Sequence, residues 1–332
     1  MDRPNKPQIP GVDTPEPRTV LIDCDPGIDD AFALLLAVAN PSINLVAVTT
    51  VAGNQTLDHV TRNALGLLSF FNAEHIPVAA GEAKPISHRQ VTAQSHGETG
   101  LGGHQLPPGS ARLSPVDGVT TIIDTLGTRP AKTVTLVAIG PLTNLARAVE
   151  RDPAIAERVA EVVIMGGANN AGNMSPVAEF NFYADPEAAD IVMRAGWPIT
   201  MLGLNLTWQS AVPAKIQRHI DASPGPIAEA FSEWLTFYSR GEHTPDEDGP
   251  SLHDACAVAY VIDPSLVDTV PAFVAVETEG TWTYGESVVD LDGKYGETDN
   301  VNYGMTLDRD RFWDLILEAL ENTPRPRPSA TQ

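Results

Sequence analysis

The stretch Asp23-Cys24-Asp25-Pro26-Gly27-Ile28-Asp29-Asp30 decides the fold of this chain. It follows a short apolar run, 19–22, which is rich in β-branched residues and predicts a buried strand. It precedes a second apolar run, 31–37, that predicts a helix, and Pro26-Gly27 turns the chain between the two. Four carboxylates therefore lie at the carboxyl end of a strand and on the first turn of a helix. This is the edge at which open α/β sheets bind ligands.

Four like charges this close together repel each other unless a cation or hydrogen-bond donors compensate them. A ligand set made only of oxygen atoms suits a hard cation such as calcium or magnesium. The stretch 23–30 therefore predicts a divalent-cation site at the edge of the sheet.

The composition narrows the kind of protein. The chain has 332 residues and a formal net charge of −22, which argues against nucleic acids and anionic membranes as partners. Its two cysteines, Cys24 and Cys256, are too few for a disulfide framework and predict small buried side chains in a reducing compartment. No apolar run reaches about 18 residues and no signal segment opens the chain, so we expect a cytoplasmic protein.

Strand-like and helix-like runs alternate along most of the chain, which predicts a mostly parallel central sheet flanked by helices, a Rossmann-like open sheet of the α/β class. The expected strands are 19–22, 44–51, 133–139, 161–165 and 199–204, and the helices between them are 30–39, 57–71, 142–150 and 186–195. Farther on we expect helices at 222–240, 253–262 and 308–321, with short strands at 272–276 and 286–291.

The domain organisation follows from the two ends of the chain. Residues 1–18 and 322–332 are polar and rich in proline, and they predict disordered tails. The length allows two domains, but no low-complexity linker interrupts residues 19–321. We therefore expect a single domain over 19–321.

Other polar residues follow predicted strands and are candidates for the same site. Asn54 comes after the strand 44–51, and His253-Asp254 opens an apolar helix. For Asn54 and Asp254 a helix cap is the structural alternative. Met165-Gly166-Gly167 ends a further strand, where glycines let the backbone approach a ligand closely.

Three loops complete the set of candidates. Residues 173–181 supply two amides and one acid around an aromatic side chain. The glycine-dense stretch 95–103 predicts either a lid over the site or an exposed loop. The acidic loop 241–251 predicts a solvated segment.

In this order the motifs resemble those of the inosine/uridine-preferring nucleoside hydrolases, over the chain from about residue 18 to residue 321. The opening Asp-Cys-Asp-Pro-Gly-x-Asp-Asp is highly specific to that family. Five further motifs match in order: Val51-Ala52-Gly53-Asn54, Gly140-Pro141-Leu142-Thr143-Asn144, Met165-Gly166-Gly167, Ala178-Glu179-Phe180-Asn181 and Leu252-His253-Asp254. The resemblance implies the nucleoside hydrolase fold and an enzyme that cleaves ribonucleosides to free base and ribose.

The resemblance also implies a calcium ion at the base of the pocket, and a homodimer or homotetramer. The implied metal ligands, completed by ribose hydroxyls and a water, are the carboxylates of Asp25, Asp30 and Asp254 and the main-chain carbonyl of Ile139. The implied ribose-binding residues, with Met165 lining the sugar pocket, are Asp29, Asn54, Asn173, Glu179, Asn181 and Asp254.

The bond to be cleaved decides what the site must supply. Breaking a ribose C1′–N bond produces an oxocarbenium-like sugar and a poor leaving group, so negative charge near C1′ favours the transition state. Calcium is expected to polarise a bound water whose proton Asp25 takes as general base. The resemblance implies that His253 protonates the leaving base and that His96 is a second contact at the base end. Attack by water in one displacement predicts inversion at C1′.

The nucleobase preference is less constrained. His96 and His253 together resemble the pyrimidine-preferring and non-specific members of the family, whereas purine-specific members are expected to stack the base between tryptophans. None of the five tryptophans lies in a motif that aligns with a base pocket. Phe237, Tyr238 and the loop that follows them are expected to shape the base end.

Two other functions compete with this interpretation. A haloacid-dehalogenase-like phosphatase also begins with Asp-x-Asp after its first strand, but its loop does not continue as Pro-Gly-x-Asp-Asp. A calcium-dependent nucleoside-binding protein without turnover would keep affinity for ribonucleosides and release no free base. Phosphatase activity would appear with p-nitrophenyl phosphate and magnesium instead.

Overall fold

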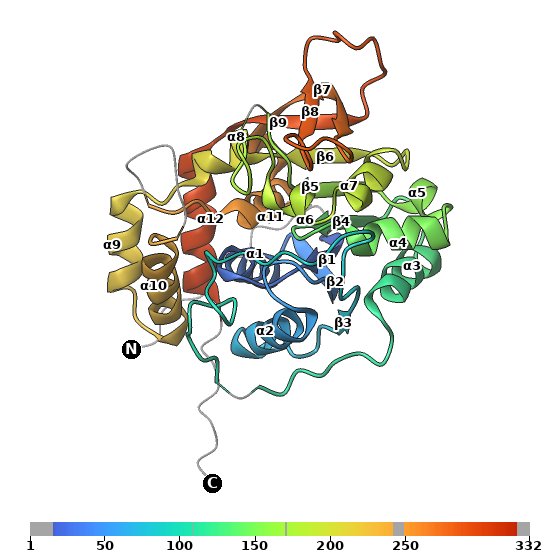
Figure 1. Ribbon diagram of the computed structural model, residues 1–332. Helices are drawn as coiled ribbons and strands as arrows, with labels where there is room; N and C mark the ends of the chain where they lie inside the picture. The colour runs from blue at the N-terminus through green and yellow to red at the C-terminus, as the bar shows by residue number, and fades with distance from the viewer. Residues whose placement is uncertain (1–15, 108, 170, 242–248, 324–332) are drawn as a thin grey trace, which may run out of the picture.

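The computed structural model describes residues 16–107, 109–169, 171–241 and 249–323 (Figure 1). Most of both expected tails, and the greater part of the acidic loop 241–251, lie outside the described residues.

The strands of the described chain form one sheet in the order β3-β2-β1-β4-β5-β6-β9-β7-β8. They are β1 (Arg18–Cys24), β2 (Ile43–Thr50), β3 (Val78–Ala80), β4 (Val134–Ala138), β5 (Glu161–Met165), β6 (Ile199–Leu202), β7 (Val267–Val276), β8 (Ser287–Asp290) and β9 (Val301–Leu307). Neighbours from β3 to β9 in this order are parallel, whereas β7 runs antiparallel to both β9 and β8. The predicted mostly parallel sheet flanked by helices is confirmed.

Helices cover both faces of this sheet (Figure 1). They are α1 (Ile28–Ala39), α2 (Leu57–Phe70), α3 (Gly118–Thr128), α4 (Thr143–Arg151), α5 (Ile155–Arg158), α6 (Phe180–Ala184), α7 (Pro186–Met193), α8 (Leu204–Thr207), α9 (Ala214–Ala222), α10 (Pro226–Tyr238), α11 (His253–Ile262) and α12 (Arg309–Asn322). One hydrophobic core includes α1, α2, α10, α11 and α12, and a second core includes α3, α4, α5 and α7. Within the described ranges, no helix combines the length and hydropathy needed to cross a membrane.

β1 is the point from which the chain builds the sheet in two directions. After β1, the chain adds β2 and then β3 on one side of β1, and it then crosses over so that β4 pairs with the other side. The carboxyl ends of β1 and β4 therefore flank the topological switch point, where open α/β sheets bind ligands. Val20 and Ile22 fill one core while Leu21 fills the other, so both faces of β1 are buried.

The structure corrects two expectations in the second half of the chain. The helix expected at 222–240 is interrupted, because the chain turns at Pro224-Gly225, where Gly225 has a φ of 114°, and α10 begins afresh at Pro226. The sequence analysis also missed β9, whose Gly304 weakens the strand pattern. A methyl group on Gly304 would come within 2.8 Å of side-chain atoms of Leu202 and Leu206, so close packing requires glycine there.

Phe32 tests the packing that holds α1 in place. Its ring is fully buried and meets the ring of Phe231 of α10 edge to face, with centroids 4.1 Å apart. Because Phe32→Ala leaves a cavity, we expect the free energy of unfolding, measured by urea denaturation, to fall by about 3–5 kcal/mol. Trp282→Ala is the control, since Trp282 is 88% exposed, and it should change stability by less than about 0.5 kcal/mol. Equal stability of the two variants would contradict this assignment of the core.

Candidate active site

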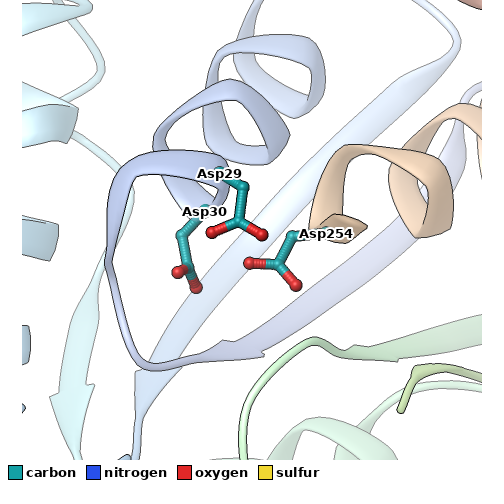
Figure 2. A group of neighbouring side chains, drawn as sticks. All are labelled: Asp29, Asp30 and Asp254. Atoms are coloured by element: carbon teal, nitrogen blue, oxygen red, sulfur yellow. The ribbon is translucent and has the colours of Figure 1, made fainter. Parts of the chain in front are cut away.

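Three aspartates meet where the first turns of two helices face each other (Figure 2). Asp29 and Asp30 lie in the first turn of α1, and Asp254 is the second residue of α11. All three residues are buried, and a carboxylate oxygen from each lies within 4.8 Å of the others. Segments about 220 residues apart in the sequence therefore build one acidic cluster, as the sequence analysis predicts for Asp30 and Asp254.

Burial makes this cluster electrostatically costly. It raises the pKa of Asp30 to about 7, with a further contribution from the Asp29 charge. Burial, followed by the charges of Asp29 and Asp30, raises the pKa of Asp254 well above its ordinary value. Among the described residues, buried Oδ1 atoms of Asp29 and Asp30 have no hydrogen-bond partner. A divalent cation would supply what these oxygen atoms lack, so the donor set fits a hard metal ion.

Asp25 lies against this cluster, beneath the floor of the site. Its Oδ2 accepts a hydrogen bond from the Asn54 N–H at 2.6 Å, while its buried Oδ1 has none from the described residues. Burial, and then the Asp30 charge, raises the pKa of Asp25 well above its ordinary value. Methyl groups on Gly53 and Gly140 would lie 2.1 and 2.7 Å from its carboxylate oxygens, so both glycines are needed for this fit.

One group of carboxylates includes residues with different predicted roles. Asp29, Asp30 and Asp254 each bring an oxygen within 4.8 Å of the others, whereas the sequence analysis assigns Asp25, Asp30 and Asp254 to the metal and Asp29 to the ribose, and that assignment stays a prediction. Asp25 accepts the Asn54 amide at one oxygen and has no hydrogen-bond partner among the described residues at the other. Ile139, the fourth expected ligand, accepts the Asn181 side-chain N–H at its carbonyl at 3.2 Å.

A second network of buried hydrogen bonds surrounds Asp23, two residues before Asp25. Asp23 Oδ1 accepts hydrogen bonds from Thr49 Oγ1 and from Asn144 Nδ2, the latter at 2.7 Å. Asn144 also donates to the Thr50 carbonyl at 3.0 Å and accepts the Glu82 N–H at 2.7 Å. These bonds tie the carboxyl ends of β1 and β2 to the start of α4. Asn144, the last residue of the Gly140–Asn144 motif, therefore stabilises this edge of the sheet.

A cavity of about 640 Å³ opens above the acidic cluster, within the size range of small-molecule sites. Two of the predicted site residues, Asp25 and Asp30, are fully buried and do not line the cavity. The others do: Asp29, Asn54, His96, Ile139, Met165, Asn173, Glu179, Asn181, His253 and Asp254. The helix-cap alternative is wrong for two of these residues. Thr56 and Leu252 occupy the N-cap positions of α2 and α11, so Asn54 and Asp254 are not the caps of these helices.

Glu179 and Asn181 are fixed to the wall by backbone groups. Glu179 caps the short helix α6 and accepts the N–H groups of Asn181, Phe182 and Gly167. Burial outweighs these donors and raises the pKa of Glu179 to about 7. Asn181 donates to the Met165 carbonyl at 3.1 Å as well as to Ile139. Asn173 is held in turn, since its Oδ1 accepts the Phe180 N–H at 2.9 Å.

His96 is held at the start of α1. Its Nδ1 accepts the Ile28 N–H at 3.0 Å, so the neutral ring carries its proton on Nε2, which lies 3.9 Å from Asp29 Oδ1. Burial lowers the pKa of His96. The ring also lies 5.0 Å from that of Tyr238. His96 is thus placed beside Asp29, on the side of the cavity where α1 begins.

The glycine-dense stretch 95–103 contributes Ser95 and His96 to the lining of the cavity. Gln55 donates to the Gly97 carbonyl at 3.1 Å, and Asn63 donates to the carbonyls of Thr99 and Pro26 at 2.8 and 2.9 Å. His96 and Leu101 are buried and attach the stretch to the start of α1 and to α2, whereas Glu98, Thr99 and Gly103 are exposed.

The chain also matches known proteins. Residues 20–314 match the family described as inosine-uridine preferring nucleoside hydrolase. The chain belongs to this family. It is accordingly a hydrolase that acts on N-glycosyl bonds. This excludes the two alternative functions, a haloacid-dehalogenase-like phosphatase and a nucleoside-binding protein without turnover. The resemblance inferred from the motifs is confirmed.

Relatives of this hydrolase match over most of their length. An inosine-uridine preferring nucleoside hydrolase from Leishmania major is 42% identical over 313 residues, which are 94% of this chain and 100% of the relative. A pyrimidine-specific ribonucleoside hydrolase from Shewanella sp. (strain MR-7) is 41% identical over 306 residues, which are 91% and 96% of the two chains. Among solved structures, a plant nucleoside hydrolase has a TM-score of 0.85 and 34% identity, covering 93% of this chain and all of that one.

The cavity of the hydrolase also has lining residues that the sequence analysis did not assign to it. Trp208 and Phe180 line it, and Tyr238, expected only in general terms at the base end, does so as well. Trp208 follows β6 by way of α8, so the carboxyl end of another parallel strand was the available signal. Thr207, directly before it, is fully buried and contacts His253, which no motif indicated.

Raised carboxyl pKa values predict how stability depends on pH when no divalent cation is present. Asp23, Asp30 and Glu179 have folded-state pKa values of about 7, above their unfolded values, so they stabilise the fold when protonated. We therefore expect the free energy of unfolding to fall from pH 5.5 to 7.5, by up to about 1.4 kcal/mol per pH unit for each proton released. Asp25 and Asp254, whose pKa values are also raised, act in the same direction, whereas His96, whose pKa is lowered, acts in the opposite direction.

Urea denaturation with a chelator measures this slope, and added calcium should flatten it because the cation takes the place of the protons. A chelated protein whose stability is constant or rises over this range would contradict the prediction.

Proposed function

We propose that this hydrolase cleaves ribonucleosides to free base and ribose in a calcium-dependent reaction, with Asp25 as general base and His253 as general acid. The observation that carries the proposal is the buried acidic cluster at the floor of a nucleoside-sized cavity, with an imidazole on its wall. The 42% identical relative from Leishmania major is named for inosine and uridine, which supports nucleosides of both base classes as substrates.

The cation would be held by Asp30, Asp254 and Asp25, with the Ile139 carbonyl and Asp29 adjacent. The support is the set of unpartnered buried oxygen atoms, together with the burial and the like-charge repulsion that raise the pKa values of Asp25 and Asp254. When bound, calcium would supply positive charge that attracts the ribose hydroxyls and makes water easier to deprotonate. The remaining steps fall to the side chains of the chain itself.

Polar side chains that line the cavity can bind the hydroxyl groups of the ribose. Asp29, Asn54, Glu179 and Asn181 are each buried and line the cavity, and they come from three segments: the start of α1, the loop after β2 and the start of α6. Carboxylate oxygens accept bonds from sugar hydroxyls, and amide groups both donate and accept. Buried polar groups of this kind reject a substrate that lacks a hydroxyl, because they are then left without a partner.

Asp25 and His253 divide the proton transfers. One Asp25 oxygen is held by the Asn54 amide, which leaves the other to take a proton from water as the water oxygen bonds to C1′. As the C1′–N bond breaks, its electron pair goes to the base, which gains a proton from His253. The negative charge around C1′ favours the oxocarbenium-like transition state. Attack and departure on opposite sides of C1′ invert this carbon.

A substrate panel tests the proposed activity. Inosine, uridine, cytidine and adenosine are incubated with the enzyme, and free base is measured by chromatography, with the 2′-deoxynucleosides as controls. We expect hydrolysis of uridine and inosine, and kcat/KM for the deoxynucleosides lower by at least about 10²-fold, since one polar contact of the ribose is missing. Activity should disappear with a strong chelator and return with calcium. Full turnover in exhaustively metal-free protein would overturn the metal assignment.

Asp25→Asn tests the general base. The substitution keeps the size and the acceptor for the Asn54 amide but removes the proton acceptor, so we expect kcat to fall by about 10²–10⁴-fold. Binding of ribose analogues, followed by calorimetry, should persist. Asp117→Asn is the matched control, because Asp117 is an exposed helix cap whose role asparagine also fulfils. Near wild-type turnover of Asp25→Asn would remove this residue from the base role.

A further inference from the structure

A segment that the motifs did not single out holds the imidazole of His253. It comprises α8 and the 3₁₀ turn Trp208–Ser210, which together follow the carboxyl end of β6. Within it, Thr207 and Ser210 are both fully buried. The Thr207 hydroxyl lies 2.7 Å from His253 Nδ1, which is hydrogen-bonding distance.

Ser210 joins the same segment to the backbone beside the histidine. Its hydroxyl donates to the Thr207 carbonyl at 2.6 Å and accepts the N–H of Leu252, the residue before His253, at 2.9 Å. Val212 continues the attachment by exchanging backbone hydrogen bonds with Pro250 and Gly249, each at 3.0 Å. Side-chain and main-chain bonds therefore fix both the start of α11 and the ring that it carries.

We infer that Thr207 is a positioning residue for protonation of the leaving base, which rests on the proposed role of His253 as the acid. The bond at Nδ1 turns that edge of the ring toward the protein interior, so Nε2 is the nitrogen presented to the substrate. A hydroxyl suits this place because its oxygen accepts the Nδ1–H of the ring. It accepts from the Nδ1–H of the imidazolium before the proton leaves Nε2, and it accepts from the same Nδ1–H afterwards.

The inference predicts an effect that depends on the leaving group. Uracil and hypoxanthine are poor leaving groups and need a proton from a correctly oriented acid. The nitrophenolate of p-nitrophenyl β-D-ribofuranoside departs as a stable anion and needs none. A residue that only orients the acid should therefore matter for uridine and inosine and be unimportant for the nitrophenyl riboside.

The experiment compares three variants on both kinds of substrate. Thr207→Val keeps the shape and removes the hydroxyl, and we expect kcat for uridine to fall at least about tenfold, a part of what general acid catalysis is typically worth, with KM little changed. Activity on the nitrophenyl riboside should stay within about twofold. Thr207→Ser restores the hydroxyl and should recover most of the uridine activity. Thr200→Val, a buried β6 threonine bonded to Glu161, is the matched control and should leave both activities unchanged.

Each result decides for or against the inference. Equal losses on both substrates would mean that Thr207 only maintains the structure, and unchanged uridine activity would mean that it has no role. If Thr207→Val does not fold, Thr207→Ala, which cannot clash, is judged by the same ratio of the two activities. His253→Ala separates this inference from the proposed function. Were this variant to lose both activities equally, the acid role itself would fail, whereas a selective loss that Thr207→Val does not share would overturn the positioning role alone.

Discussion

The removal of several carboxylates from water is the constraint on which the rest of this structure depends. Asp25, Asp30 and Asp254 are each buried, and their ionised forms are disfavoured by desolvation and by one another. A fold keeps such a cluster only where nearby groups or a bound cation compensate it. The Asn54 amide, the first turn of α1 and the buried hydrogen bonds of Asp23 and Asn144 supply part of that compensation. The unpartnered oxygen atoms mark the part that remains for a cation.

The location of the cluster follows from the sheet. Parallel strands end at one edge, and the switch between β1 and β4 opens a crevice there. Each parallel strand near the crevice contributes residues just after its last residue: Asp25 after β1, Asn54 after β2 and Ile139 after β4. His253 and Asp254 come from outside this scheme, on α11 in the carboxyl-terminal half.

Much of this was accessible from sequence because its signals are local. β-branched runs, breaks at proline and glycine, and polar residues after strands predict the alternating architecture and most of the cavity lining. What escaped prediction depends on long-range packing. β9 was missed because Gly304 weakens its strand pattern. Glycine is needed there for close packing against Leu202 and Leu206, which lie far away in the sequence. Thr207 resembles any buried threonine until the fold brings His253 to it across 46 positions of sequence. The turn of Asp25 toward Asn54 is likewise a matter of side-chain geometry.

The residues around the cavity come from two kinds of structural element. The floor belongs to strand ends and buried helix starts that cannot change without disturbing both cores. The rest of the lining includes Trp208, Phe180 and Tyr238, which come from the turn after α8, from α6 and from α10. These three side chains belong neither to the acidic cluster nor to the proposed proton transfers. We expect the nucleobase preference to change through substitutions at these three positions, and directed evolution of new preferences should begin there.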